Sequence, residues 1–180
     1  MVSKSAMASV VALAVVAVAC LIAFGPWGDD ESVSNPVLRT DVRVGDTVVV
    51  EGTTALSDEF EHFRSEYTVL EASSEGVSVR EVITDTDTGR QSDITRTFPS
   101  EEAFLEGVYV RAPMDSVARN FEAIGDTVLD TPFGRVACDI WRSTTSSQQF
   151  EVWLSSDGTV YMMAGDGFEI RLVSTSLLSG

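Results

Sequence analysis

The chain has 180 residues and a formal net charge of −16, with 28 acidic and 12 basic residues. Beyond an apolar stretch near the start, about 150 residues remain, enough for one domain with its own hydrophobic core. Such an acidic surface repels nucleic acid, so we expect no nucleic-acid partner. Lys4 is the single lysine. This acidic, lysine-poor composition is compatible both with a GC-rich genome and with adaptation to high salt.

The apolar stretch is Ala6–Phe24, and none of its residues is charged. A helix of this length spans about 28 Å, close to the ~30 Å of a bilayer's hydrocarbon core. Three interpretations compete: a secretory signal cleaved after Ala17-Val18-Ala19, a lipoprotein signal that leaves Cys20 acylated, and an uncleaved signal-anchor. The apolar run continues past Cys20 as far as Phe24. This continuation favours the anchor, which makes the membrane the first expected partner of the chain.

Positive charge near the apolar stretch predicts its orientation. Lys4 precedes the stretch, and no Lys or Arg follows it until Arg39. The positive-inside rule therefore places the N-terminus in the cytoplasm and the rest of the chain outside the cell membrane. We predict a signal-anchor at 1–27, a polar tether at 28–41 and an extracytoplasmic domain at 42–180.

The pattern of the domain is mainly β. Alternating apolar residues between turn signals predict a series of strands. They are Thr47–Glu51, His62–Ala72, Val77–Thr84, Ser92–Phe98, Thr127–Leu129, Arg135–Ser143, Gln149–Leu154, Val160–Met163 and Phe168–Val173. The expected fold is one antiparallel, highly curved sheet or half-barrel.

One or two short helices interrupt the strands. Ser100 followed by two glutamates is typical of a helix start, and Phe104 and Leu105 follow within the next turn. A second helical segment is expected from Met114 to Phe121, after Pro113. We expect these helices to lie against one face of the sheet.

No group of residues indicates catalysis. His62 lies among acidic residues on a predicted strand, and no serine occupies a nucleophile elbow. We therefore expect no enzyme activity and no cofactor. Cys138 alternates with aliphatic residues and is interpreted as a small buried hydrophobe.

A short acidic segment resembles the start of a calcium loop. Asp85 and Asp87 have the right spacing, but Gly89 and Arg90 stand at the fifth and sixth positions, and Arg96 at the twelfth. A calcium loop needs an oxygen ligand, a glycine and a glutamate there. The segment is therefore interpreted as a hairpin turn, and no metal site is expected.

Large aromatic and sulfur-containing side chains give the sharpest hypothesis for a binding site. Trp141, Trp153, Tyr161 and Met163 alternate with the aliphatic residues of their strands, so we expect them to share one face of the sheet. Either the helices cover that face as ordinary core, which most apolar faces are, or it stays partly open and takes an apolar ligand.

Three segments of the last third carry a resemblance to known proteins. They are TPFGRVAC at 131–138, FEVWLSSDGTVYMM at 150–163 and FEIRLVST at 168–175. Their turn spacing resembles the ending of small extracytoplasmic β domains of archaea and bacteria. The outline is similar to the half-barrel of lipoprotein-carrier-like proteins, and the resemblance implies a curved sheet that cradles lipid. No binding residue of that family has a match here.

These observations lead to two hypotheses of function. The first is a membrane-anchored, non-enzymatic binding or interaction module of the cell envelope, with a protein or an apolar ligand as its partner. The alternative is a carrier or sensor of an apolar or lipid ligand on the concave sheet face.

Overall fold

The computed structural model describes residues 33, 35–55, 61–144 and 149–179. The chain divides into two units, and the second, Val33–Gly180, contains all of these residues. The predicted membrane segment, Ala6–Phe24, lies outside them, as does part of the predicted tether. In the part of the chain that the structure describes, no helix is long and apolar enough to cross a membrane.

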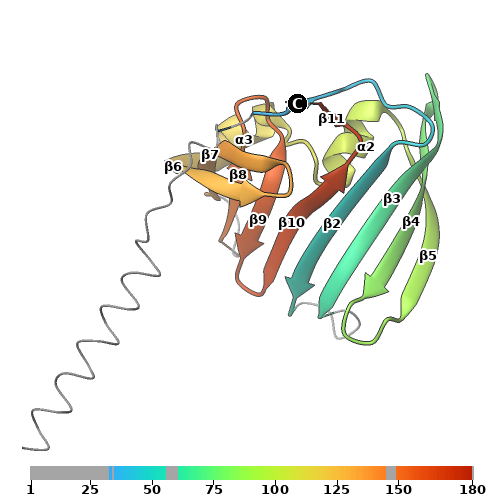
Figure 1. Ribbon diagram of the computed structural model, residues 1–180. Helices are drawn as coiled ribbons and strands as arrows, with labels where there is room; N and C mark the ends of the chain where they lie inside the picture. Colours follow the sequence, from blue (N-terminus) through green and yellow to red (C-terminus); the bar gives the residue numbers. More distant parts are fainter. Residues whose placement is uncertain (1–32, 34, 56–60, 145–148, 180) are drawn as a thin grey trace, which may run out of the picture. The chain divides into compact units, whose positions relative to one another are not determined.

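One antiparallel sheet forms most of the second unit (Figure 1). Its strands are β2 (Thr47–Thr54), β3 (His62–Ser73), β4 (Gly76–Asp85), β5 (Gln91–Phe98), β6 (Phe121–Thr131), β7 (Gly134–Ser143), β8 (Phe150–Leu154), β9 (Val160–Gly165) and β10 (Phe168–Thr175). Within the described residues their order across the sheet is β5-β4-β3-β2-β10-β9-β8-β7-β6. The prediction of a mainly β, antiparallel domain is confirmed.

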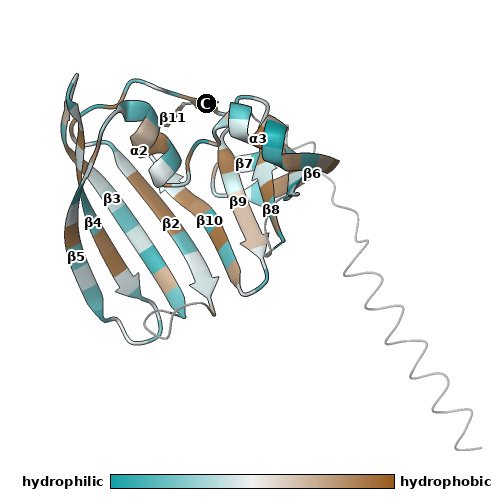
Figure 2. Cartoon of the chain, turned by 180° about the vertical axis from the view of Figure 1, so that it is seen from behind, coloured by the Kyte–Doolittle hydropathy of each residue, from teal (hydrophilic) through white to brown (hydrophobic). Residues whose placement is uncertain are grey.

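Two runs of neighbouring strands, β2–β5 and β6–β10, join where β10 pairs with β2. This arrangement leaves β5 and β6 at the two edges of the sheet. The chain that connects them contains α2 (Glu101–Gly107) and α3 (Met114–Asn120). Figures 1 and 2 show a curved sheet with both helices on the same side. The two predicted short helices are confirmed.

Helix α2 supplies the centre of the larger core. Its N-cap is Ser100, whose side chain accepts a hydrogen bond from the amide of Ala103 (3.0 Å). Phe104 and Leu105 are buried against the sheet, and the ring of Phe104 meets that of Phe98 edge-on, with centroids 5.6 Å apart. Full burial of a Phe or Leu side chain contributes about 1.5–3 kcal/mol. The apolar side of this short helix therefore holds it on the sheet.

A short arm closes one end of the domain. Strand β1 (Val37–Leu38) pairs with β11 (Leu178–Ser179) near the C-terminus. Leu38 is buried, and its amide donates a hydrogen bond to Oδ2 of Asp157 (3.0 Å). The sequence placed the start of the domain at Val42, whereas this pairing extends the folded unit back to Val37. A two-residue strand is too short to show periodicity, and its partners lie at the other end of the sequence.

Candidate functional site

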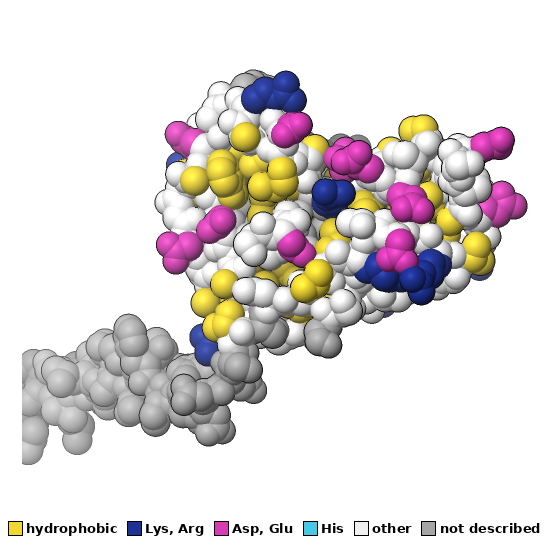
Figure 3. Space-filling model, turned by 90° about the horizontal axis from the view of Figure 1, so that it is seen from above, with side chains coloured by type: hydrophobic (Ala, Val, Ile, Leu, Met, Phe, Trp, Pro, Cys, Tyr) yellow, Lys and Arg dark blue, Asp and Glu magenta, His cyan; other side chains and the backbone are white. Residues whose placement is uncertain are grey.

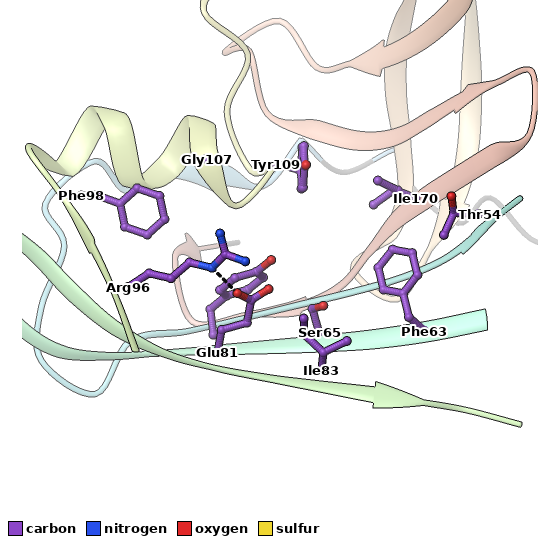
Figure 4. Close-up of a pocket in the computed structure, with 11 residues that line it drawn as sticks. Thr54, Phe63, Ser65, Glu81, Ile83, Arg96, Phe98, Gly107, Tyr109 and Ile170 are labelled. Carbon is purple, nitrogen blue, oxygen red and sulfur yellow. Dashed lines mark hydrogen bonds and ion pairs between the residues drawn. The ribbon is translucent and has the colours of Figure 1, made fainter. Parts of the chain in front are cut away.

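A hollow of about 290 Å³ lies between the inner face of β2–β5 and the end of α2 (Figure 4). Side chains alternate along a strand, and the register pairs Ser65 with Ile83 and Tyr67 with Glu81. These four side chains and Phe63 therefore point to the same face. The volume is close to the lower limit for sites that hold small molecules.

The walls of the hollow are mostly apolar and its floor is polar. Phe63, Ile83, Phe98, Tyr109 and Ile170 form the walls, together with Gly107. The polar lining comes from Thr54, Ser65, Tyr67, Glu81 and Arg96. Small-molecule sites typically combine apolar walls with a few placed polar groups in this way.

Gly107 allows α2 to approach the wall of the hollow. A Cβ atom on this residue would lie 2.5 Å from Cε1 of Phe98, which is closer than any real contact. A side chain at this position would therefore displace the Phe98 ring or lift the end of α2.

An ion pair forms the polar centre of the floor. Nε of Arg96 donates a hydrogen bond to Oε2 of Glu81. The Glu81 side chain is only 4% exposed, whereas that of Arg96 is 52% exposed. A carboxylate buried this deeply needs a charged or hydrogen-bonded partner. Arg96 therefore compensates Glu81 with one donor, and the rest of its planar donor group faces the hollow.

The Tyr67 phenol lies in the same floor. Burial, and then the negative charge of Glu81, raise the pKa of Tyr67 well above its usual range. The phenol is therefore neutral at any physiological pH. Its position beside Glu81 makes the floor a compact group of three polar side chains below apolar walls.

A second hollow, of about 280 Å³, lies beside α3. Its lining includes Val117 of α3 and apolar side chains from β6, β8 and β9, among them Phe121, Phe150 and Met163. The rings of Phe121 and Phe150 meet edge-on, with centroids 5.3 Å apart. Figure 3, seen from above, shows hydrophobic side chains gathered over the part of the molecule that contains α3 and β6–β8.

Tyr109 lines both hollows. It follows α2, and its φ of 61° is the one positive value found at a non-glycine residue in the described part of the chain. The amide of Tyr109 donates to the carbonyl of Glu106 (3.2 Å), and that of Val110 donates to the carbonyl of Leu105 (3.0 Å). These two bonds make a Schellman cap, in which the left-handed position is usually glycine. A tyrosine there costs about 1–3 kcal/mol of backbone strain.

The aromatic face that the sequence predicted does not exist as one surface. The register pairs Trp141 with Val152, and Ile140 with Trp153. Directly paired residues point to the same face of a sheet, so Trp141 and Trp153 lie on opposite faces. The alternation within β7 and within β8 was predicted correctly, but the phase between these two strands was wrong. On β9 the register shifts between Val160 and Met162, so the predicted alternation of Tyr161 and Met163 was wrong as well.

The four predicted ligand-binding residues thus form two separate groups. Trp141 and Met163 pack against the cluster that includes Val117 of α3. Trp153 and Tyr161 pack with Cys138 on the other face. Of the four, only Met163 lines a hollow described above. Ligand binding by these four residues stays a prediction.

The residues that line the hollow beneath α2 were not singled out from the sequence, although one signal was present. Val77, Val79 and Ile83 share the inward face of β4, and Glu81 occupies the remaining position of that alternation. An acidic residue in phase with buried aliphatic residues must find a partner within the fold. That interruption of the apolar pattern is the feature that indicates a polar site.

The other residues considered from the sequence have structural surroundings. His62 is exposed and pairs with Asp87 (Nδ1 to Oδ2, 2.7 Å). Asp85 caps the turn between β4 and β5 by accepting hydrogen bonds from the amides of Asp87 and Thr88. Among the described residues, no group of three potential ligands could hold a metal ion.

Comparisons with known proteins leave the family of this chain open. No family model matches the chain, and no curated protein matches it. One solved structure with a similar outline is that of a candidate lipoprotein from Parabacteroides distasonis. The two are 15% identical with a TM-score of 0.41, and the match covers 79% of this chain and 100% of the other.

Proposed function

We propose that the domain binds an uncharged amphiphile, with its apolar part in the hollow beneath α2. The observation that carries this proposal is the Glu81–Arg96 pair at the floor of an otherwise apolar hollow. Binding does not require a reaction, and we propose no catalysis. In this proposal the domain is a non-enzymatic module of the cell envelope, and the hollow beneath α2 is its ligand site.

The polar floor determines which end group fits. Arg96 keeps N–H donors beyond the one that Glu81 accepts, so a ligand oxygen that accepts hydrogen bonds is favoured. A full negative charge on the ligand is disfavoured, because Glu81 lies beside the site and the whole chain carries −16. An ester or alcohol oxygen satisfies both conditions.

The apolar stretch Ala6–Phe24 supports a location of the domain outside the cell membrane. A domain anchored outside the cell membrane lies next to a supply of amphiphiles, and the short tether keeps it there. Protease added to spheroplasts should digest the domain without lysis. The intact mass of the membrane-extracted protein should be that of an unmodified, uncleaved chain. A mass that shows an acylated Cys20 would instead indicate a lipoprotein, and loss of the apolar stretch would indicate a cleaved secretory signal.

A photoactivatable ligand tests the binding site. The full-length protein is placed in nanodiscs of uncharged lipid and exposed to a diazirine-bearing monoacylglycerol, and the labelled peptides are mapped by mass spectrometry. We expect label on β3, β4 and β5 at the hollow. Ile83→Arg should remove it, because a charge then enters the apolar wall.

A matched variant controls for surface changes. Val128→Arg places the same charge on the edge strand β6, where Val128 is 41% exposed and outside both hollows. This variant should label like the wild type. Absence of label from β3–β5, or equal labelling of both variants, would contradict the proposal and favour a protein as the partner.

A further inference from the structure

The concave side of the domain holds two hollows of nearly equal size, of about 290 and 280 Å³. Each lies just below the range of about 300–1,000 Å³ that is typical for small-molecule sites, whereas a joined site would fall within it. Tyr109 is the one aromatic residue that lines both. The two hollows therefore adjoin at this residue.

The backbone gives no reason for a tyrosine at position 109. The Schellman cap after α2 needs a positive φ, which glycine adopts without strain and a bulky residue does not. The residue is also 41% exposed, so it is not held there by deep burial. The hydroxyl makes no hydrogen bond to any residue that the structure describes. What the residue does contribute is part of the wall of both hollows, and Figure 4 shows its ring at the hollow beneath α2.

Because Tyr109 lines both hollows, we propose that its ring separates them, confines the ligand to the one beneath α2 and so determines ligand length. The inference rests on the proposed function. It assigns the natural ligand to amphiphiles with a short apolar chain. A longer chain would have to pass the ring to reach the apolar hollow formed by Phe121, Phe150 and Met163.

Two photoactivatable monoacylglycerols test the assignment, one with an octanoyl and one with a palmitoyl chain. The full-length protein in nanodiscs is labelled with each, and the label is mapped to peptides. For the wild type we expect the octanoyl probe to label the hollow beneath α2 and the palmitoyl probe to label it about tenfold less, a ratio that apolar pockets commonly achieve.

Tyr109→Gly is the informative variant, because it removes the ring and relieves the backbone. Labelling by the palmitoyl probe should rise about tenfold and extend to peptides of β8 and β9. The midpoint of thermal unfolding should stay the same or rise, since glycine suits the left-handed position. Tyr109→Phe keeps the ring and should behave like the wild type, and Tyr109→Asn, which also tolerates this backbone, should behave like the glycine variant.

The outcomes separate this inference from the proposed function. Equal labelling of the wild type by both probes, or a glycine variant with an unchanged preference, overturns the role of Tyr109 and leaves the binding site in place. Absence of label from β3–β5 with either probe overturns the proposed function itself. A large loss of stability in both the glycine and the asparagine variants shows a structural role for the ring and also overturns the inference.

Discussion

Arg96 and Glu81 are paired across the neighbouring strands β4 and β5, but their side chains lie in different surroundings. The Arg96 side chain is 52% exposed and that of Glu81 only 4%. The two residues are diagonal neighbours, since Glu81 is directly opposite Ile94 and Arg96 is opposite Val79. The buried carboxylate depends on a partner in the floor of the hollow, so the pair couples the stability of the domain to its proposed ligand site.

Removal of the guanidinium should therefore destabilise the protein. Arg96→Met leaves the Glu81 carboxylate buried without its charged partner, and we expect a loss of about 2 kcal/mol in the free energy of unfolding. The double variant with Glu81→Leu should recover part of this loss, because no buried charge remains. Urea denaturation of the four proteins of this double-mutant cycle measures the coupling. A double variant less stable than Arg96→Met would contradict the interpretation.

Asp157 should hold the N-terminal arm on the domain. Its Oδ2 accepts a hydrogen bond from the amide of Leu38, and its Oδ1 accepts from Ser155 and Thr159. Asp157→Ala should cost about 2 kcal/mol and raise the rate of hydrogen exchange at the Leu38 amide. Asp166→Ala, in the exposed turn between β9 and β10, is the matched control and should change neither.

The same carboxylate should make stability depend on acid pH. Burial opposes ionisation of Asp157, but the hydrogen bonds from Ser155, Leu38 and Thr159 outweigh it and lower the pKa of the group. Its contribution is complete above the ordinary aspartate pKa of about 3.9 and is lost as the pH falls through the lower folded value. The stability difference between the wild type and Asp157→Ala should thus shrink below about pH 4. A difference that grows on acidification would contradict this account.

His62 should titrate in the opposite sense. Its hydrogen bond to Asp87, and then the charge of that carboxylate, raise the pKa of the imidazole. The protonated pair therefore stabilises the protein below the ordinary histidine pKa of about 6.5, and this contribution is lost as the pH rises through the folded value. The wild type should exceed His62→Gln in stability more at about pH 5.5 than at about pH 8. Asp87→Asn should abolish that difference.

Cys138 should be inert in the folded protein. The side chain is buried, and burial raises the pKa of its thiol to about 11. Since the thiolate is the reactive form, iodoacetamide should modify native Cys138 at least about a hundredfold more slowly than an unfolded cysteine with a pKa of about 8.5. Mass spectrometry of a Cys20→Ala background isolates this one thiol. Rapid modification without denaturant would show that Cys138 becomes accessible in the native state.

Local patterns in the chain carried much of the fold. The serine at position 100 and the acidic turn after it predicted the start of α2, and alternation predicted most of the strands. Strand β6 is the main exception, since it runs over Phe121–Thr131 while only Thr127–Leu129 was predicted. Most of its side chains are exposed, so no apolar alternation marks it.

In regular stretches such as β7 and β8, the sequence by itself determined which side chains share a face, because that depends only on the two-residue period of the backbone. It did not reveal the register shift on β9, which places Tyr161 and Met163 in different clusters. It did not determine how neighbouring strands are phased. Trp141 and Trp153 were therefore assigned to one face, and the register places them on opposite faces. The candidate site depends on the same long-range information. Glu81, Arg96 and Tyr109 come from two strands and a helix cap, and only the tertiary structure brings them to one hollow.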